Sequence, residues 1–574
     1  MTRADQFVVG VLVLLLAIIA GAVGAPAFAP ALAPSANPTF VPVVARPYRE
    51  GVLGRVTSVN PLTAVTRADH DLVALVFSGL VALGPGDAMV PGLASDWSVD
   101  AAGKVWTFRI RDDARWQDGV PVTADDVVFT VGVLQDPSYG GPGAASWRDV
   151  TARATGQRTV TFELSTPIGG FLQAATQPIV PAHLLRGIPI AQLGDDPFGR
   201  APIGTGPFQL VTLDDQHAVL KPARYDVIPA GPGRSAAPAR TLPPAGSTQR
   251  PTRPLPSLSG IEMRFFDDPG ALAAAYEAGD LDGASGLPPD QATRLASEAG
   301  SRLLRYPTSR LTVIVLNLRK SRPEFRDPKI RVALLEAIDR VAIVKDAFGG
   351  GAVRADAPIP PSSWAFNRAA SPPLPYDQLA TRKALLAAGW KAVTGGLARP
   401  GDKTPLAFDL LSPDAISNPG TFGAARRIAA DWRRLGLKVS QVGLSAADLV
   451  GQRLRTGAFA AAVVDVNVGL DPDLYPLLAS SQTTSLGINF SGLQDLALDK
   501  LLVAARAPGS DEARRAAYVV LQKALAAGQY ILPIAFRDEL VVVRDGLSGP
   551  AIRPIGDPAD RFWDVLTWRL AVDR

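Results

Sequence analysis

Apolar and polar residues alternate between Val105 and Arg111 in a way that predicts a β-strand with one buried face. Trp106, Phe108 and Ile110 fall on one face, and Thr107, Arg109 and Arg111 fall on the other. Thr123 then provides an N-cap for a helix that begins with Asp125 and Asp126, because carboxylates are favoured at the positive end of a helix. A strand followed by a capped helix favours an α/β arrangement.

Two longer helices are predicted in the second half of the chain, each with a polar cap, an apolar stripe and a terminal glycine. The caps are Thr421 and Ser510, the apolar residues are Ile428, Trp432 and Leu435 in the first and Tyr518, Leu521 and Leu525 in the second, and the glycines are Gly436 and Gly528. Strands are expected after these helices, at Val439 and at Ile531. Such alternation predicts layered α/β domains.

The segment from Pro91 to Thr130 resembles a motif of a known protein family. It reads PGLASDWSVDAAGKVWTFRIRDDARWQDGVPVTADDVVFT, and the family pattern is P-x-L-A-x-x-W, then G-x-x-x-x-F-x-L-R, then F-x-D-G-x-P-x-T-A-D-D-V. This pattern is that of the family 5 extracellular solute-binding proteins of ABC importers, which include oligopeptide-, dipeptide- and nickel-binding proteins. Further similar pieces follow the family order: NPLTAVTRADHDLVALVFSGL from Asn60, IVPAHLL from Ile179, PIGTGPFQL from Pro202, DPKIRVALLEAIDRVAIV from Asp327, ALLAAGW from Ala384 and DPDLYPLL from Asp471.

The resemblance implies an α/β, two-lobed periplasmic-binding-protein fold with an extra third domain, hinged by two crossover segments. Lobe I combines residues 48–75, 202–305 and 530–574. The extra domain covers residues 76–201, and lobe II covers residues 306–529. A solute bound between the lobes holds them closed, and the permease reads the closed form.

Two segments lie outside this scheme. Residues 1–25 contain the uncharged run Phe7–Ala25, which is predicted to be either a membrane anchor or a cleaved signal segment. Pro26 and Pro30 disturb the cleavage region, which favours the anchor, and the Pro/Ala-rich residues 26–47 are expected to form a spacer. Residues 227–259 are rich in Pro, Gly, Ser and Ala and have no acidic residue, so we expect a disordered insertion in lobe I.

Composition narrows the class of protein. The chain has 574 residues, 47% of them hydrophobic, which suffices for several packed domains. A net charge of +4 is small for this length, and no basic patch interleaved with aromatic residues indicates a nucleic-acid partner. The absence of cysteine excludes disulfides, thiolate metal ligands and a thiol nucleophile.

Enzymatic motifs are missing from the sequence. There is no H-E-x-x-H, no G-x-S-x-G and no G-x-x-x-x-G-K-[ST], and the segment at Gly204 reads as a tight turn. The three histidines, His70, His183 and His217, are far apart in sequence, so no metal site is predicted. We therefore expect no catalytic residues and no cofactor.

Candidate ligand contacts in the second lobe come from the resemblance. Peptide-binding relatives hold the α-ammonium with an aspartate three residues before a [DE]-P pair, and here that position is Val468. A buried ammonium needs a counter-ion, so an amino-terminated solute requires Asp465 to reach the same point. Otherwise Asp465 is an aspartate at a strand end that faces solvent. The other second-lobe candidates are Asn467, Ser485 and Asn489, which offer hydrogen bonds to a polar solute.

The first-lobe candidates are Arg55 and Thr57, in the strand GRVTSVNPL. They occupy positions at which relatives contact ligand. The planar guanidinium of Arg55 suits a carboxylate or a phosphate. The structural alternative for Arg55 is a salt bridge at a strand edge.

The sequence thus predicts a non-catalytic solute receptor of an ABC importer, outside the cytoplasm. Its expected partners are a peptide or another polar organic solute, the permease subunits, and the membrane through its N-terminal segment, and we expect a monomer. An oligosaccharide receptor of the same fold, with Trp364 and Trp390 as candidate stacking surfaces, stays open as an alternative. A sensory or scaffold binding protein without a permease is a second alternative, and an unrecognised hydrolase a remote third.

Overall fold

The computed structural model describes residues 46–86, 88–224, 256–484 and 487–571. The predicted anchor, most of the spacer, nearly all of the insertion at 227–259, and Ser485 lie outside these residues. Every contact below belongs to the unit that runs from Arg46 to the C-terminus. In the part of the chain that is described, no helix is both long and apolar enough to cross a membrane.

A mixed sheet is the backbone of this unit, with strand order β17-β16-β18-β12-β19-β11-β1-β10-β9-β8 and β13 paired with β19. The strands β1 and β11 run parallel, and so do β16 and β17, whereas β12 is antiparallel to both of its neighbours. Their bounds are β1 Tyr48–Leu53, β8 Phe208–Leu213, β9 His217–Pro222, β10 Ile261–Phe266, β11 Gly283–Ser285, β12 Ser301–Leu316, β13 Ala352–Arg354, β16 Ala407–Pro413, β17 Lys438–Leu444, β18 Ala461–Asn467 and β19 Leu532–Arg544. The α/β class predicted from the sequence is confirmed.

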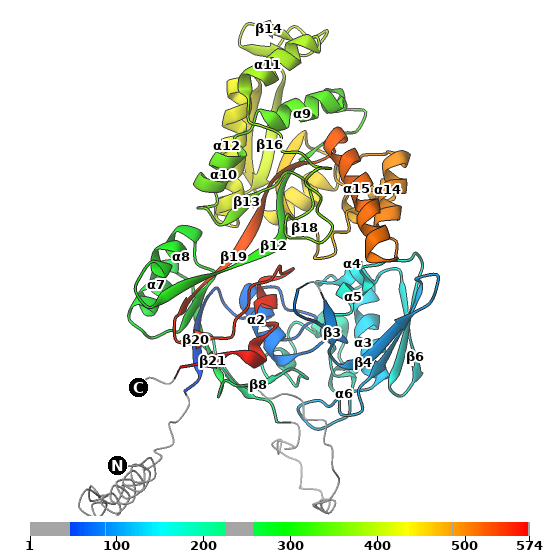
Figure 1. The fold of residues 1–574 in the computed structure, drawn as a ribbon, viewed down its shortest axis with the longest axis vertical. Helices are drawn as coiled ribbons and strands as arrows, with labels where there is room; N and C mark the ends of the chain where they lie inside the picture. Colours follow the sequence, from blue (N-terminus) through cyan, green and yellow to red (C-terminus); the bar gives the residue numbers. More distant parts are fainter. Residues whose placement is uncertain (1–45, 87, 225–255, 485–486, 572–574) are drawn as a thin grey trace, which may run out of the picture. The chain divides into compact units, whose positions relative to one another are not determined.

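Two long strands connect the two halves of this sheet. Figure 1 shows β12 and β19 side by side, running from the elements around β16 and β18 to the helices α7 and α8. Their pairing shifts between Pro307 and Leu311, so the ladder is irregular midway along both strands. The predicted boundary between residues 305 and 306 falls inside β12, just before the irregularity that begins at Pro307. The lobe boundaries stay a prediction.

A second sheet, of order β4-β5-β7-β6, lies within residues 76–201. The strand predicted from the alternation is β5 (Val105–Ile110), and its three apolar residues are buried. The predicted helix is α3 (Ala124–Gln135), whose N-cap Thr123 forms a capping box with Asp126. The remaining strands are β4 (Ala94–Val99), β6 (Val150–Gly156) and β7 (Thr159–Leu164).

The two longer helices are present, and one cap was predicted wrongly. In α12 (Pro419–Leu435) the cap is Asn418, whose side chain accepts from the amide of Thr421, and Pro419 occupies the first turn, where proline is tolerated. Thr421 instead turns its hydroxyl towards Asp465. The apolar stripe and the left-handed Gly436 of α12 are confirmed, as are the Ser510 cap and the buried stripe of α15 (Asp511–Gly528).

Shorter elements complete the description. The helices are α2 (Arg67–Val76), α4 (Ala144–Trp147), α5 (Phe171–Ala174), α6 (Ala182–Leu185), α7 (Pro269–Glu277), α8 (Pro289–Ala296), α9 (Pro328–Glu336), α10 (Arg340–Asp346), α11 (Gln378–Ala387), α13 (Tyr475–Leu478), α14 (Leu496–Arg506), η7 (Pro558–Phe562) and several single turns. The two-residue to three-residue strands are β2 (Val81–Leu83), β3 (Met89–Pro91), β14 (Lys391–Val393), β15 (Gly396–Ala398), β20 (Leu547–Ser548) and β21 (Arg569–Leu570). Gly206, in the predicted tight turn, donates its amide to the carbonyl of Val76 at the end of α2, an approach that leaves no room for a side chain.

Candidate functional site

Helix α2 is fixed at its start by an unusually well-bonded carboxylate, Asp69. Thr66 caps the helix, and Asp69 returns a bond to the Thr66 amide. The same carboxylate accepts from the amide of Thr57 at 2.6 Å and from the Thr57 hydroxyl at 2.6 Å. These bonds lower the pKa of Asp69 even though burial acts to raise it. The candidate residue Thr57 thus holds the start of α2.

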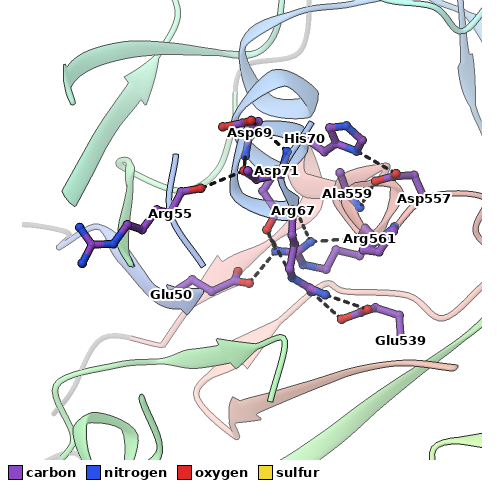
Figure 2. A network of polar contacts seen from close by, with 12 residues as sticks. Glu50, Arg55, Arg67, Asp69, His70, Asp71, Glu539, Asp557, Ala559 and Arg561 are labelled. Atoms are coloured by element: carbon purple, nitrogen blue, oxygen red, sulfur yellow. Dashed lines mark hydrogen bonds and ion pairs between the residues drawn. The ribbon is translucent and has the colours of Figure 1, made fainter. Parts of the chain in front are cut away.

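A buried charge cluster joins α2 to the C-terminal segment (Figure 2). Arg561 in η7 bonds Asp71 at 2.7 Å and Glu50 at 2.8 Å, and all three side chains are almost completely buried. Arg67 bonds Glu539 of β19 at 2.5 and 2.9 Å. Burial alone would lower the pKa of Arg561, but the neighbouring carboxylates raise it well above its usual value. The cluster therefore locks β1, α2, β19 and η7 together.

One turn along α2, His70 pairs with Asp557 at 2.9 Å. The hydrogen bond to Asp557 raises the pKa of His70 to about 9, so the imidazole is cationic at neutral pH. Burial raises the pKa of the nearby Asp560 to about 6, and the charge of Asp557 adds to this shift. The three side chains place a mixed set of charges beside α2.

A cavity of about 1440 Å3 opens on this set of charges. Its walls come from α2, from residues of the 76–201 segment and from the 557–566 segment. The charged lining residues are His70, Arg111, Asp113, Arg115, Arg224, Asp557 and Asp560, and the aromatic ones are Phe77, Trp147, Phe562 and Trp563. Binding sites for small molecules usually measure roughly 300–1,000 Å3, so this cavity suits a solute larger than a single amino acid.

Asp465 lies on β18 and is held by several internal bonds. Its carboxylate accepts from Arg310 at 2.7 Å, from Thr312 at 2.6 Å and from Asn418 at 3.0 Å, and the Thr421 hydroxyl contacts both oxygens. Burial acts to raise the pKa of Asp465, but the charge of Arg310 and these bonds lower it. Arg310 is therefore the cationic partner of Asp465 within the chain.

Asn467, two residues further along β18, reaches the segment that lines the cavity. Its amide nitrogen donates to the carbonyl of Gly556 at 2.8 Å, next to Asp557. Its amide oxygen accepts from Ser309 at 2.6 Å. Asn467 therefore joins the second half of the sheet to the residue that precedes the lining residue Asp557.

The other predicted residues lie elsewhere or point inward. Arg55 is exposed and forms a bidentate pair with Asp267. Asn489 is buried, and its amide nitrogen donates to the carbonyls of Leu478, Ala479 and Leu493. Val468 is buried. The structure thus brings Asn467 against Gly556, next to the lining residue Asp557, and it does not group Arg55, Thr57 and Asn489 there.

The aromatic and histidine candidates have close neighbours within the chain. The Trp364 ring is approached by the guanidinium groups of Arg514 and Arg515 at 4.6 and 5.5 Å, and Trp390 is buried in the core. His183 pairs with Asp118, and His217 with Asp214. Among the described residues no group of three or more His, Cys, Asp or Glu side chains is placed to hold a metal ion.

Gln173 links the cavity to the second half of the chain, and sequence reasoning missed it. This residue of α5 lines the cavity, and its side-chain oxygen accepts from the amide of Asp471 at 3.0 Å. Asp471 in turn binds Arg514 through both oxygens at 2.8 Å. Beside this contact, the amide of Gly169 donates to the carbonyl of Arg506. The only sequence signal was the D-P pair at Asp471; nothing singled out Gln173, Asp557 or Asp560.

Comparison with known proteins decides the family. The model of the bacterial extracellular solute-binding proteins, family 5, matches residues 88–486. The chain belongs to this family. This family 5 protein is similar to the protein XP55 of Streptomyces lividans, with 28% identity over 87% of this chain and 85% of the relative. It is 26% identical to the nickel-binding periplasmic protein of Escherichia coli, over 87% of this chain and 91% of the relative.

Solved structures agree on the fold. The structure of the oligopeptide-binding protein AppA from Bacillus subtilis, in complex with a nonapeptide, matches 92% of this family 5 protein and 100% of its own chain, with a TM-score of 0.70 and 23% identity. NikZ from Campylobacter jejuni, in complex with Ni(L-His), gives a TM-score of 0.69 over 91% of this chain and 99% of its own. The two-lobed periplasmic-binding-protein fold is therefore confirmed, and the protein is a solute-binding component of an ABC importer that acts outside the cytoplasm.

Proposed function

We propose that this protein captures a peptide-like or other polar organic solute in the cavity beside α2 and delivers it to an ABC permease. The observation that carries the proposal is the cavity of about 1440 Å3, whose walls bear charges of both signs together with aromatic side chains. A peptide-like molecule presents the complementary set of groups, with an amine, a carboxylate, amides and apolar side chains.

Individual lining groups suggest how the solute is oriented. Asp560 accepts from the amides of Gly556 and Asp557 through one oxygen, and it is one of the residues that line the cavity. A solute ammonium is a suitable partner for this carboxylate. Arg115 and Arg224 line the cavity and are exposed, so they can meet an anionic group or a carbonyl of the solute.

Closure is proposed to depend on Gln173. Because Gln173 lines the cavity and also bonds the backbone of Asp471, a solute that orders its side chain favours this contact between the 76–201 segment and lobe II. The permease then recognises the closed form. The relatives named oligopeptide- and nickel-binding proteins show the range of solutes within the family, and the cavity of this chain favours the peptide-like end of that range.

Membrane attachment and the monomeric state belong to the same proposal. The uncharged run Phe7–Ala25 would hold the protein at the outer face of the membrane, with residues 26–47 as the spacer. Removal of residues 1–45 should release a folded, monomeric protein from the membrane fraction. A shortened chain that stays in the membrane fraction would contradict the anchor.

The cavity is tested by filling it. Ser146 lines the cavity and is exposed, so Ser146→Trp should block the solute while the fold persists. Ser98 on the exposed face of β4 provides the control, Ser98→Trp. Calorimetry with a pool of tripeptides should show binding to the wild type and to the control, and loss of binding in Ser146→Trp. Equal binding by all three proteins would place the solute elsewhere.

A further inference from the structure

Arg537 carries a positive charge that no group of the described chain pairs with. It lies on β19, and its Nε and Nη1 atoms are buried without a hydrogen-bond partner in the described structure. No carboxylate among those residues lies within ion-pair distance of its guanidinium. Arg561, by contrast, is fully buried and bonds two carboxylates.

The carboxylates around Arg537 are already bound to other arginines. Asp465 pairs with Arg310 at 2.7 Å. Asp538 pairs with Arg305 at 2.6 Å, and Glu539 pairs with Arg67 at 2.5 Å. Each neighbouring acid therefore has its own cation, and Arg537 is the one left over in this group.

Apart from these paired carboxylates, the guanidinium lies beside an aromatic ring and the start of a helix. It lies 4.3 Å from the centre of the Phe348 ring, which stabilises the cation only in part. The first turn of α12 lies on another side of the guanidinium. A Cβ atom added to Gly420 in this turn would be 3.1 Å from Nη1 of Arg537. The start of a helix carries a partial positive charge. Burial correspondingly lowers the pKa of Arg537, although the charge of Asp465 acts to raise it.

A buried cation without a counter-ion costs free energy. For this reason, removing one partner of a buried ion pair strongly destabilises a protein. The planar guanidinium is also the side chain best matched to a carboxylate, because it can donate two parallel hydrogen bonds. We infer that Arg537 anchors a carboxylate of the bound solute. The inference rests on the proposed solute-binding function and adds that the solute is anionic at one end.

The position of Arg537 suits this role. It is two residues from Glu539 on the same face of β19, and Glu539 holds Arg67 at the start of α2, the helix that also presents His70 to the cavity. On β18, Asp465 lies two residues before Asn467, which bonds Gly556 beside the lining residue Asp557. Arg310 is half-exposed, so this part of the molecule meets solvent. Arg537 thus lies on the strand that passes between the two halves of the protein.

The test combines unfolding with binding. In the full-length protein without added solute, Arg537→Met should unfold at the same temperature as the wild type or at a higher one, because it removes an unpaired buried charge. Arg294→Met, which removes an exposed arginine paired with Glu277, is the control and should change little. An Arg537→Met protein that unfolds several degrees below the wild type and below the control would show that Arg537 is a structural ion-pair partner and would overturn the inference.

Binding is measured with two tripeptide pools that differ only in having a free or an amidated C-terminus. The wild type should bind the free-acid pool at least about tenfold more tightly, and Arg537→Gln should remove that preference while Arg294→Gln keeps it. Arg537→Lys should restore part of the preference, because it keeps the charge and loses the planar fork. If the wild type binds both pools equally and Arg537→Gln does the same, the inference fails and the proposed function stands. If the wild type binds neither pool, both the peptide-like solute and the inference are overturned.

Discussion

Two arginines, the fully buried Arg561 beside α2 and the partly buried Arg537 beside α12, differ in whether the nearby carboxylates bond them. Arg561 is enclosed by Asp71 and Glu50, and its bonds connect residues that are 490 and 511 positions apart in sequence. Arg537 sits against a helix N-terminus and an aromatic ring, while each nearby carboxylate serves another arginine. A buried arginine that is paired with carboxylates, such as Arg561, stabilises one arrangement of the chain. An arginine without such a partner, such as Arg537, is better explained by a negative charge that the ligand brings.

The largest effect expected from this comparison is on the paired side. Arg561→Met leaves Asp71 and Glu50 buried without their cation, so it should lower the free energy of unfolding by about 3–5 kcal/mol. Urea unfolding followed by circular dichroism measures the change. Arg537→Met, measured alongside, should not destabilise the protein, and a similar loss in both variants would break the comparison.

A smaller effect is expected from the pH dependence of the His70–Asp557 pair. The pKa of His70 is raised to about 9 in the folded protein, mainly by the hydrogen bond to Asp557, from an ordinary value near 6.5. The stabilisation is therefore complete below about pH 6.5 and disappears as the pH rises through about 9. Because the imidazole is about one-third exposed, we discount the effect to about 1–2 kcal/mol.

The measurement compares unfolding of the wild type and His70→Gln between pH 6.5 and 9.5. This window lies above the pKa of about 6 of Asp560. The raised pKa of Asp560 also lowers stability as the pH rises, but this change is largely complete by about pH 6, below the window. The advantage of the wild type should shrink steadily with pH. A difference that is constant across the window would contradict the assignment of a cationic His70.

The cap of α12 sharpens the comparison on the unpaired side. Asn418→Ala removes the bond to the Thr421 amide and one donor to Asp465, so it should cost about 1 kcal/mol of stability. Thermal unfolding against the control Ser417→Ala, one residue earlier, gives this value. A negligible change would mean that Asp465 and the first turn of α12 are held by Thr421, Thr312 and Arg310 alone.

The smallest effect concerns the contact between Gln173 and Asp471. Gln173→Ala should weaken solute binding by about 0.5–1.5 kcal/mol, the usual net worth of one hydrogen bond, and leave the unfolding temperature nearly unchanged. The control is Gln192→Ala, because Gln192 lies on an exposed turn. Gln135 is not used, because its side chain bonds the backbone of the cavity residue Trp147. Equal binding by Gln173→Ala and the wild type would show that closure does not depend on the bond between Gln173 and Asp471.

Local patterns in the sequence predicted much of the fold. The alternation around Phe108 and the cap at Thr123 are local features, and both are confirmed. The order of the motifs predicted the family, and the hydrophobic periodicity of single elements could not have done so. The error at Thr421 is also local: Asn418 and Thr421, three residues apart, are both residue types that cap helices, and in the structure Asn418 is the cap while Thr421 bonds Asp465.

The candidate site was less accessible from the sequence because its groups come from distant segments. Asp557 and Asp560 lie beside α2, which is nearly five hundred residues away in sequence. Arg537 differs from other arginines only in that the carboxylates near it are paired with Arg305 and Arg67. Asn467 was chosen from the family resemblance, and the structure places it against Gly556. The ligand roles of Arg55, Thr57, Asp465, Asn467, Ser485 and Asn489 stay predictions.

Mass spectrometry of the solute released from natively expressed protein tests the central claim most directly. The account predicts a peptide-like molecule with a free carboxylate, present at about one per protein, recovered from the wild type and from Ser98→Trp and lost from Ser146→Trp. A neutral sugar or a bare metal ion at that stoichiometry, or the same solute recovered undiminished from Ser146→Trp, would contradict it.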